Sequence, residues 1–441
     1  MPPEFDTLIE NGIVITVNRT FDVLESGRVC IQNGRIACVE AAADRPRPAA
    51  AEVIDADGGI IMPGLVNTHT HAAMTLFRGL ADDLPLDIWL REHVFPAEGR
   101  FINAANVEIG TTLACAEMLL AGTTTFCDGY FYEDAVAQAV DRVKMRAVLG
   151  QGVIDMPAPG VPDPAENIRR AEAFVQKWRG ASPLISSAVF CHSPYTCSPH
   201  TLAAAKEAAH QNGVLFQIHA AETRREARRL PTGPGVSPLR FLDDLGVMDD
   251  RTLLVHAVWL EEGDIDLIRR RAAAVSHNPE SNMKLAAGVA PVNRLLTAGV
   301  PVGLGTDGCA SNNDLDLFKE MDTAAKLHKV THLDPTVMDA ATVLKMATID
   351  GARAIGLSPF IGSIEVGKEA DIVVLKSRQP HLTPMYHPVS QIVYAAGGGD
   401  VRDVMIAGRV VVRNRRLTTI DGRDVMQRAR DLSRTIRTFK K

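Results

Sequence analysis

The stretch around which the chain is organised reads Ile61-Met62-Pro63-Gly64-Leu65-Val66-Asn67-Thr68-His69-Thr70-His71. It is a short apolar run that ends in two histidines one residue apart. Side chains at positions i and i+2 of a strand point to the same face, so His69 and His71 can reach one metal ion from a strand end. Two ordinary loop histidines would give the same pattern, and the pair alone does not decide between these readings.

Downstream of this stretch, short apolar runs alternate with segments of helix length as far as about residue 361. The runs predict eight strands, at Leu65-Val66, Thr123–Cys127, Arg146–Val153, Ile185–Phe190, Val214–Ile218, Leu253–Val255, Ala273–Val275 and Val302–Leu304. Helices are expected between them, including Ala104–Ala121, Pro164–Trp178, Pro199–Gln211 and Glu261–Arg271. Eight such units over roughly 300 residues favour an α/β fold, a (β/α)8 TIM-like barrel. An open doubly wound sheet is less favoured, because no Gly-x-Gly-x-x-Gly follows a strand.

Both ends of the chain have strand character instead. Residues 7 to about 60 alternate apolar and polar side chains, and Asn11-Gly12 and Asn33-Gly34 are turn signals. Near the other end, strands are expected at Ala370–Leu375, Gln391–Tyr394, Val404–Ile406 and Arg409–Val412, followed by a helical tail at Gly422–Lys441. These segments predict a small β-sandwich domain made from residues 1–60 and 362–441, into which a barrel of residues 61–361 is inserted.

The composition excludes several classes of protein. The 441 residues are 46% hydrophobic and 23% charged, as in soluble globular proteins, and the net charge of −6 does not favour nucleic acid or an anionic membrane as partner. Neither a signal peptide nor a membrane span is evident. Seven scattered cysteines argue against a disulfide framework and favour a cytoplasmic protein, with Cys191 and Cys197 as packing residues.

Polar side chains follow the predicted barrel strands at the points where the strands end. They are His69 and His71 after strand 1, His192 after strand 4, His219 and Glu222 after strand 5, His256 after strand 6, His277 after strand 7 and Asp307 after strand 8. Active sites of barrels lie at this C-terminal rim. The sequence therefore places the groups that a metal hydrolase needs along one rim.

The chemistry of these groups fits such an enzyme. A catalytic zinc site takes about three protein ligands and keeps one position for water. His69, His71 and His219 can supply imidazoles, and Asp307 can touch the metal or accept the proton of water. Glu222 can act as a general acid or base, and His256 can orient the water. Non-catalytic roles remain open for two of these residues, since Glu222 could begin a charged helix and Asp307 could be a turn residue.

Six stretches carry a resemblance to a known family, and a terminal segment at Gly362–Asp371 fits as well. They are Pro63–Met74, Arg78–Leu86, His192–Tyr195, His219–Thr223, Ser276–Leu285 and Gly305–Asn313. On these motifs the chain resembles the amidohydrolase superfamily and, within it, the 5′-methylthioadenosine/S-adenosylhomocysteine deaminases. The resemblance covers nearly the whole chain, and Arg78–Leu86 and the strand 8 loop are its most specific parts.

The resemblance implies a role for each of the rim residues. His69, His71 and His219 would bind one divalent ion, most simply Zn²⁺, with Asp307 as a further ligand that also shuttles protons. Glu222 would protonate the purine ring nitrogen beside the reacting carbon, and His256 would assist the attacking hydroxide. Release of ammonia would give the inosine product.

The same resemblance implies the substrate contacts. Trp89 would pack near the base or sugar; the alternative is a core residue of the helix Leu86–His93. Glu98 would bind the ribose hydroxyls, and His192 would hydrogen-bond the substrate. Binuclear relatives carry a bridging lysine at strand 4; because strand 4 ends in His192 here, one metal ion is expected.

One position departs from what relatives that bind S-adenosylhomocysteine would need. Gln151 stands near the end of strand 3, where we expect an arginine to hold the carboxylate of the homocysteine moiety, and Gln cannot pair bidentately with that group. We therefore expect Gln151 at the substrate, and methylthioadenosine or adenosine to be preferred over S-adenosylhomocysteine.

Other functions remain open at this point. The same barrel serves guanine or 8-oxopurine deaminases and triazine hydrolases, and a barrel with a dead site could act as a binding protein. The expected partner is a small purine nucleoside, without nucleic acid or membrane. We also expect a homo-oligomer, a dimer or a tetramer, although the sequence does not fix its size.

Overall fold

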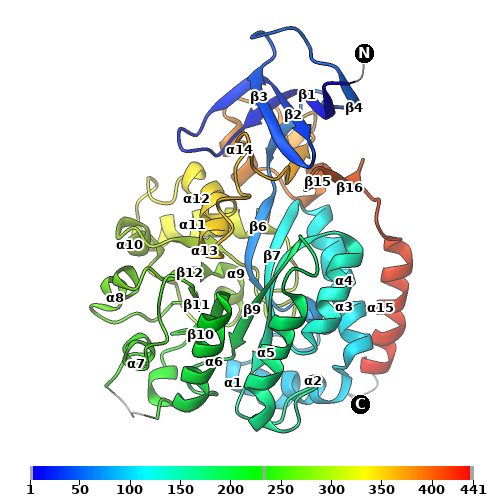
Figure 1. Ribbon diagram of the computed structural model, residues 1–441. Coiled ribbons are helices and arrows are strands. Elements are labelled where there is room, and N and C mark those ends of the chain that lie inside the picture. The colour runs from blue at the N-terminus through cyan, green and yellow to red at the C-terminus, as the bar shows by residue number, and fades with distance from the viewer. Residues whose placement is uncertain (1–2, 232–234, 438–441) are drawn as a thin grey trace.

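The eight barrel strands form one parallel sheet in the order of the chain, β6 to β13 (Figure 1). The computed structural model describes residues 3–231 and 235–437. The strands are β6 Leu65–Thr70, β7 Thr123–Tyr130, β8 Arg146–Val153, β9 Ile185–Cys191, β10 Leu215–Ala220, β11 Thr252–His256, β12 Ala274–His277 and β13 Val302–Leu304. The predicted (β/α)8 barrel is confirmed.

The ring closes where the end of β13 returns to β6. The backbone N–H of Asp307 donates to the carbonyl oxygen of His69 at 3.0 Å, and that of Thr306 donates to Oδ1 of Asn67 at 3.1 Å. Every residue of β7 and β8 is buried, as expected of strands covered on both faces. The residues that follow β6 and β13 are thereby held side by side at one rim.

Helices surround the barrel. The covering helices are α3 Ala104–Leu120, α4 Glu133–Val143, α5 Asn167–Trp178, α6 Pro199–Asn212, α7 Pro238–Asp244, α8 Asp264–Arg270, α10 Val292–Thr297, α11 Leu317–His332, α12 Ala340–Met346 and α13 Ile349–Ala354. Their ends follow local chemistry, as in α6, where Ser198 accepts from the N–H of Thr201, Pro199 occupies the first turn and Gly213 ends the helix at φ 66°. Asp163 caps the turn before α5, its side chain accepting from the N–H of Ala165.

The two ends of the chain build the smaller domain together. Its strands are β1 Phe5–Ile15, β2 Val23–Gln32, β3 Arg35–Ala41, β4 Ala50–Asp55 and β5 Ile60–Pro63 from the N-terminal side, and β14 Ile372–Leu375, β15 Val401–Ile406, β16 Arg409–Arg413 and β17 Arg416–Leu417 from the C-terminal side. They belong to one sheet, in which β5 pairs antiparallel with β14. A separate apolar core, with Ile9, Ile31 and Met405 among its members, lies within it. The domain boundaries at residues 60 and 361 stay a prediction.

Two local predictions in this domain were wrong. Asn11-Gly12 is not a turn, because β1 runs through it and the pairing with β2 shifts register there, as in a bulge with Asn11 at φ 57°. The segment Gln391–Tyr394 is not a strand but part of helix α14, Pro388–Tyr394. Pro388 favours the first turn of a helix, and the apolar side chains of this segment pack against the barrel helices α11 and α12.

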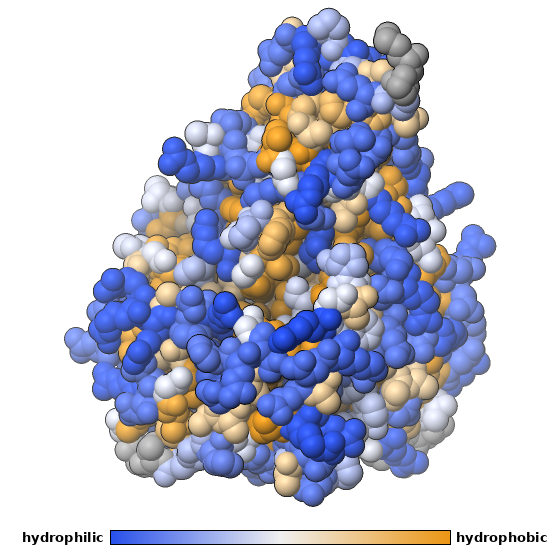
Figure 2. All heavy atoms as spheres, in the orientation of Figure 1, coloured by the Kyte–Doolittle hydropathy of each residue, from blue (hydrophilic) through white to orange (hydrophobic). Residues whose placement is uncertain are grey.

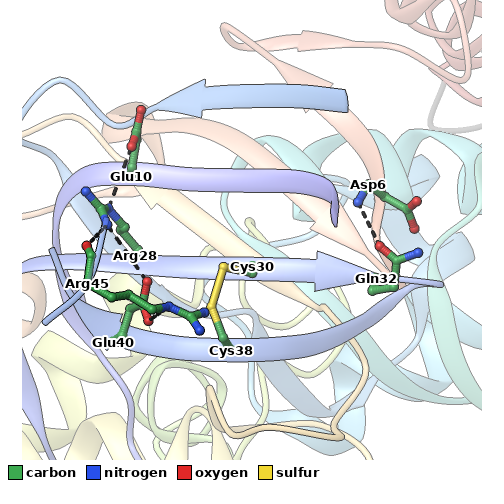
Figure 3. The surroundings of a disulfide bond; sticks show 8 residues. All are labelled: Asp6, Glu10, Arg28, Cys30, Gln32, Cys38, Glu40 and Arg45. Atoms are coloured by element: carbon green, nitrogen blue, oxygen red, sulfur yellow. Dashed lines mark hydrogen bonds and ion pairs between the residues drawn. A yellow bond between two sulfur atoms is a disulfide. The ribbon is translucent and has the colours of Figure 1, made fainter. Parts of the chain in front are cut away.

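A disulfide joins Cys30 and Cys38 across the hairpin of β2 and β3 (Figure 3). The two residues are register partners, with Cα atoms 4.9 Å apart, because the predicted Asn33-Gly34 turn brings them opposite each other. The scattered cysteines predicted no disulfide framework, and this single local disulfide was not predicted. Cys191 and Cys197 are free and buried, as expected of packing residues.

The barrel and the smaller domain are joined by a buried ion pair. The guanidinium of Arg146, at the start of β8, lies 2.8 Å from the carboxylate of Asp371, which precedes β14. The last helix, α15 Gly422–Arg437, lies along α3 of the barrel (Figure 1). The basic helical tail was predicted over this segment, and residues 438–441 of that prediction lie outside the described residues.

The surface is mostly hydrophilic on the face drawn in Figure 2, where apolar atoms gather in separate patches. Within residues 3–231 and 235–437, no helix combines the length and the apolar character that crossing a membrane requires.

Candidate active site

Three histidine nitrogens converge at the rim of the barrel. A ligand nitrogen of His69, one of His71 and one of His219 all lie within 4.8 Å of one another, and Nε2 of His69 is 3.2 Å from Nε2 of His219. Nδ1 of His71 donates to the carbonyl oxygen of Gly129 at 2.6 Å, and this hydrogen bond leaves Nε2 as the ring nitrogen that can serve as a ligand toward the cluster. Such a set of close acceptor nitrogens fits a cation.

A carboxylate completes the cluster. Oδ1 of Asp307 lies 3.5 Å from Nε2 of His69 and 3.4 Å from Nε2 of His71. Burial alone would raise the pKa of Asp307, but the hydrogen bond and charge of the two histidines hold it well below its usual value. The three imidazoles and this carboxylate are the kind and number of ligands that a catalytic divalent ion takes.

The pKa of the Glu222 carboxyl is shifted in the opposite direction from that of Asp307. It follows β10 and lines the same cavity as the cluster. Burial, reinforced by the charge of Asp307, raises the pKa of Glu222 to about 8. At neutral pH this side chain therefore carries a proton that it can donate inside the cavity.

Two further histidines face the cavity as neutral rings. Burial lowers the pKa of His256 and of His192 to about 4 in each case. The ring of His256 lies 5.4 Å from that of His219, between centroids, and Nδ1 of His192 is 2.9 Å from Oγ1 of Thr196. His256 at φ 78° and Asp307 at φ 59° both have left-handed backbones, a strained conformation that tends to occur at functional sites.

The cavity above these groups has a volume of about 800 Å³, including its open mouth. Part of its wall is the segment 86–101, which consists of α1 Leu86–Ile88, the π-helical turn η2 Trp89–Val94 and α2 Phe95–Phe101. π-Helical turns are rare in proteins overall, but those that occur are often found at functional sites. The segment contributes to the wall the side chains of Leu86, Trp89, Leu90, Val94, Phe95 and Glu98.

Both residues expected from this segment thus reach the cavity. Trp89 donates from its indole nitrogen to the carbonyl oxygen of Ala81 at 3.1 Å, which fixes the ring in the wall. Oε1 of Glu98 accepts from the hydroxyl of Tyr130 at 2.6 Å. Burial raises the pKa of Glu98 to about 7, although the Tyr130 hydrogen bond works in the other direction.

Two residues expected at the rim lie elsewhere. Gln151 is buried, but its amide bonds the backbone: Oε1 accepts from the N–H of Glu133 at 3.3 Å and Nε2 donates to the carbonyl oxygen of Gly152 at 3.4 Å. His277 is directed toward α11, where its Nε2 lies 3.2 Å from Nε2 of His328. Neither side chain is among the described residues that line the cavity.

The structure also brings in side chains that were not singled out as site residues. Tyr130 and Phe190 line the cavity at the ends of β7 and β9, and Ser311 lines it beside Asp307. Tyr130 could have been found had the predicted strand been extended from Cys127 to its observed end. Ser281 and Asn282 contact the rim residues from behind; both lie in the Ser276–Leu285 motif, but neither residue was predicted to have a role.

The comparisons with known proteins agree with this geometry. Residues 60–411 match the amidohydrolase family. A 5-methylthioadenosine/S-adenosylhomocysteine deaminase of Syntrophobacter fumaroxidans is 48% identical over 98% of each chain. A 5′-deoxyadenosine deaminase of Methanosarcina mazei is 43% identical over 96% of each chain. A solved adenosine deaminase from Xanthomonas campestris with bound zinc is 42% identical, with a TM-score of 0.95 over 99% of this chain and 100% of that one.

Proposed function

Because this chain belongs to the amidohydrolase family, we propose that it is a metal-dependent aminohydrolase that deaminates an adenosine-type nucleoside to the inosine product with release of ammonia. The observation that carries this proposal is that the carboxyl of Glu222, whose pKa burial raises to about 8, lines one cavity with His71, His219 and Asp307 of the ligand cluster. Hydrolytic deamination needs an activated water on one side of the ring and an acid for a ring nitrogen on the other.

His69, His71, His219 and Asp307 would hold one divalent ion, most simply Zn²⁺. Bound there, such an ion would make hydroxide available near neutral pH. The convergence of four ligand atoms within a buried rim supports this assignment. A single ion is further supported by the cavity wall, since no lysine among its described residues could supply a bridge between two metals.

The other rim residues supply proton transfer. Glu222 donates its proton to the purine ring nitrogen next to the reacting carbon. Asp307, whose carboxylate stays ionised, accepts the proton of the attacking water and passes it toward the leaving amine. His256 is neutral and can hydrogen-bond that water through its free ring nitrogen.

The cavity wall selects a nucleoside. Glu98 accepts from ribose hydroxyls, Trp89 packs against the base or the sugar, and His192 hydrogen-bonds the substrate. Because the described residues of the wall include no lysine or arginine, a 5′ group with a carboxylate would be buried without a cation. Methylthioadenosine or adenosine is therefore the preferred substrate, and S-adenosylhomocysteine the poorer one. Gln151 does not take part as directly as we expected, because its amide is bonded to backbone.

An ammonia-release screen tests this function. Methylthioadenosine, adenosine, 5′-deoxyadenosine and S-adenosylhomocysteine are compared by kcat/KM, with metal content measured on the same sample. Guanine, 8-oxopurines and triazines serve as controls. Release of ammonia only from those controls would replace the proposed function by theirs. A metal-loaded protein that binds nucleosides without turnover would indicate a binding protein.

The remaining attributes are proposed on the same basis. The relatives are named as deaminases of small nucleosides, so we propose a cytoplasmic enzyme without nucleic-acid or membrane partners, in keeping with the net charge of −6. We also propose a homo-oligomer, a dimer or a tetramer, which light scattering of the purified protein would test.

A further inference from the structure

Two consecutive residues reach the reacting side chains from behind the rim. They are Ser281 and Asn282, in the short helix α9, Pro279–Lys284, which follows β12. Both are buried, with 0% and 1% of their surface exposed, so neither can contact a substrate in the cavity. Each donates instead to a residue to which the proposed function gives a role in proton transfer.

Ser281 acts on Asp307. Its hydroxyl donates to Oδ2 at 2.7 Å, and the hydroxyl of Ser311 donates to the same oxygen at 2.9 Å. Oδ1 accepts from the backbone N–H of Gly308 at 2.8 Å and is the oxygen that faces His69 and His71. With two hydroxyls on one oxygen, the carboxylate cannot rotate without losing both, and Oδ1 stays directed at the histidine cluster.

Asn282 acts on His256. Its amide Nδ2 donates to Nδ1 of the ring at 3.0 Å. An amide nitrogen is only a donor, so Nδ1 must be the acceptor nitrogen of a neutral imidazole, and the ring proton sits on Nε2. The contact therefore selects the tautomer that presents an N–H donor from Nε2.

The helix that carries the two residues is itself held from outside. Oγ1 of Thr323 on α11 donates to the carboxylate of Glu280 at 2.8 Å. Nζ of Lys284 lies 2.6 Å from the carboxylate of Asp82, in the loop that precedes the cavity segment 86–101. These contacts at both ends fix α9 against the barrel. The Ser281 hydroxyl and the Asn282 amide are therefore held at defined positions.

We propose that Ser281 and Asn282 are positioning residues of the reaction: Ser281 fixes the orientation of the Asp307 carboxylate so that one of its oxygens faces the metal ligands, and Asn282 sets the tautomer of His256. The inference rests on the proposed function for its catalytic consequence, but its metal-binding consequence can be measured without any substrate. Residues that orient ligands in this way typically change metal affinity or activity about 10–100-fold when they are removed.

The test for Ser281 uses the holoenzyme. Ser281→Ala should release zinc to a chelator of known affinity about 10-fold more readily than the parent protein, and Ser281→Thr, which keeps the hydroxyl, should restore most of this loss. The matched control is Ser237→Ala. Ser237 is equally buried and donates to a buried carboxylate, Asp264, at 2.8 Å, but it caps α7 away from the cavity. Its loss should lower Tm and leave zinc affinity and kcat unchanged.

The test for Asn282 compares two replacements. Asn282→Asp keeps the size of the side chain but offers an acceptor to Nδ1, which selects the opposite tautomer of His256. Asn282→Ala selects neither. We expect kcat to fall by about 10-fold in Asn282→Ala and further in Asn282→Asp, with KM changed less than about 3-fold in both. A role in packing alone would rank the two variants the other way, because the aspartate fills the same space.

The outcomes separate this inference from the proposed function. If Ser281→Ala keeps parental zinc affinity, or if Asn282→Asp is as active as the parent, the positioning role is overturned. If the parent releases no ammonia from any adenosine nucleoside while Ser281→Ala still loses zinc and Ser281→Thr regains it, the role of Ser281 stands and the proposed function fails.

Discussion

The hydroxyl of Tyr130 donates a 2.6 Å hydrogen bond to the carboxylate of Glu98 inside the cavity wall. One partner ends β7 and the other lies on α2, so the bond ties the barrel to the segment that covers its mouth. It also favours the ionised form of a carboxyl whose pKa burial has raised to about 7. The ionisation of Glu98 therefore depends on its neighbour.

Removing that donor should weaken nucleoside binding. In Tyr130→Phe the pKa of Glu98 should rise above its value of about 7, so fewer carboxylates are available at neutral pH to accept from ribose. We expect KM for adenosine to rise about 5–10-fold, and more at pH 6 than at pH 8, with a smaller change in kcat. Steady-state kinetics at several pH values measure this. The double variant with Glu98→Gln should be no worse than Glu98→Gln alone, and fully additive effects would contradict the coupling.

Glu222→Gln should keep the metal and lose turnover. The amide has the size of the carboxyl but no acidic proton, and loss of a general acid costs about 10²–10⁴-fold. Single-turnover rates and metal analysis of the same sample measure both effects. Retained turnover per bound ion would contradict the assigned role.

The pH dependence of kcat/KM in the parent enzyme should also show that Glu222 acts as an acid. The active form of Glu222 is protonated, so kcat/KM should fall as pH rises through about 8, where that carboxyl loses its proton. The descending limb should be absent from the residual activity of Glu222→Gln. If kcat/KM falls at the same pH in both proteins, the group that loses its proton there is not Glu222.

The segment 86–101 is tied across the cavity by Asp87. Its carboxylate lies 3.1 Å from Arg225 and 2.6 Å from Arg229, which follow Glu222 in the chain. Asp87→Ala should raise KM about 2–5-fold and leave metal content unchanged, because these partly exposed pairs contribute at most about 1 kcal/mol. The parent KM should rise with salt and that of the variant should not. Asp266→Ala removes an exposed pair with Arg269 on α8 and serves as the control.

The ion pair of Arg146 and Asp371 should matter for stability and not for rate. Its side chains are only 8% and 2% exposed, so Arg146→Met leaves a buried carboxylate without its cation. We expect a loss of about 3–5 kcal/mol in the free energy of unfolding, measured with urea, and unchanged kcat. Arg142→Met removes a half-exposed pair with Glu108 and should cost less than about 1 kcal/mol. Equal losses in the two variants would contradict the role of burial.

The barrel could be predicted because its strands are apolar on both faces and are separated by helices of regular length. Arg146–Val153 and Val302–Leu304 match the observed strands, and the others differ by a few residues at their ends. The segment Gln391–Tyr394 failed because a short apolar run is compatible with a strand or a helix, and packing against α11 and α12 decided it.

The site was predictable to the extent that strand ends meet at one rim. His69 and His219 lie near the ends of β6 and β10 and Asp307 follows β13, and the closure of the sheet brings the three together. Side-chain direction was less accessible, since Gln151 lies in the expected strand but its side chain accepts from the backbone at the start of α4. The contacts of Ser281 and Asn282 depend on how α9 folds behind the rim, which no local pattern encodes.

The shared sheet of the two termini has a consequence for biosynthesis. Ile61 of β5 pairs with Val374 of β14, so strands made first must wait for strands made more than 300 residues later. At the usual rate of about 5–20 residues per second, a ribosome needs about 15–60 s to supply the partner. During that interval β5 offers an open edge, while the barrel between the two strands can already fold. The smaller domain can therefore be completed only after β14 has been made, later than the barrel that precedes it in the chain.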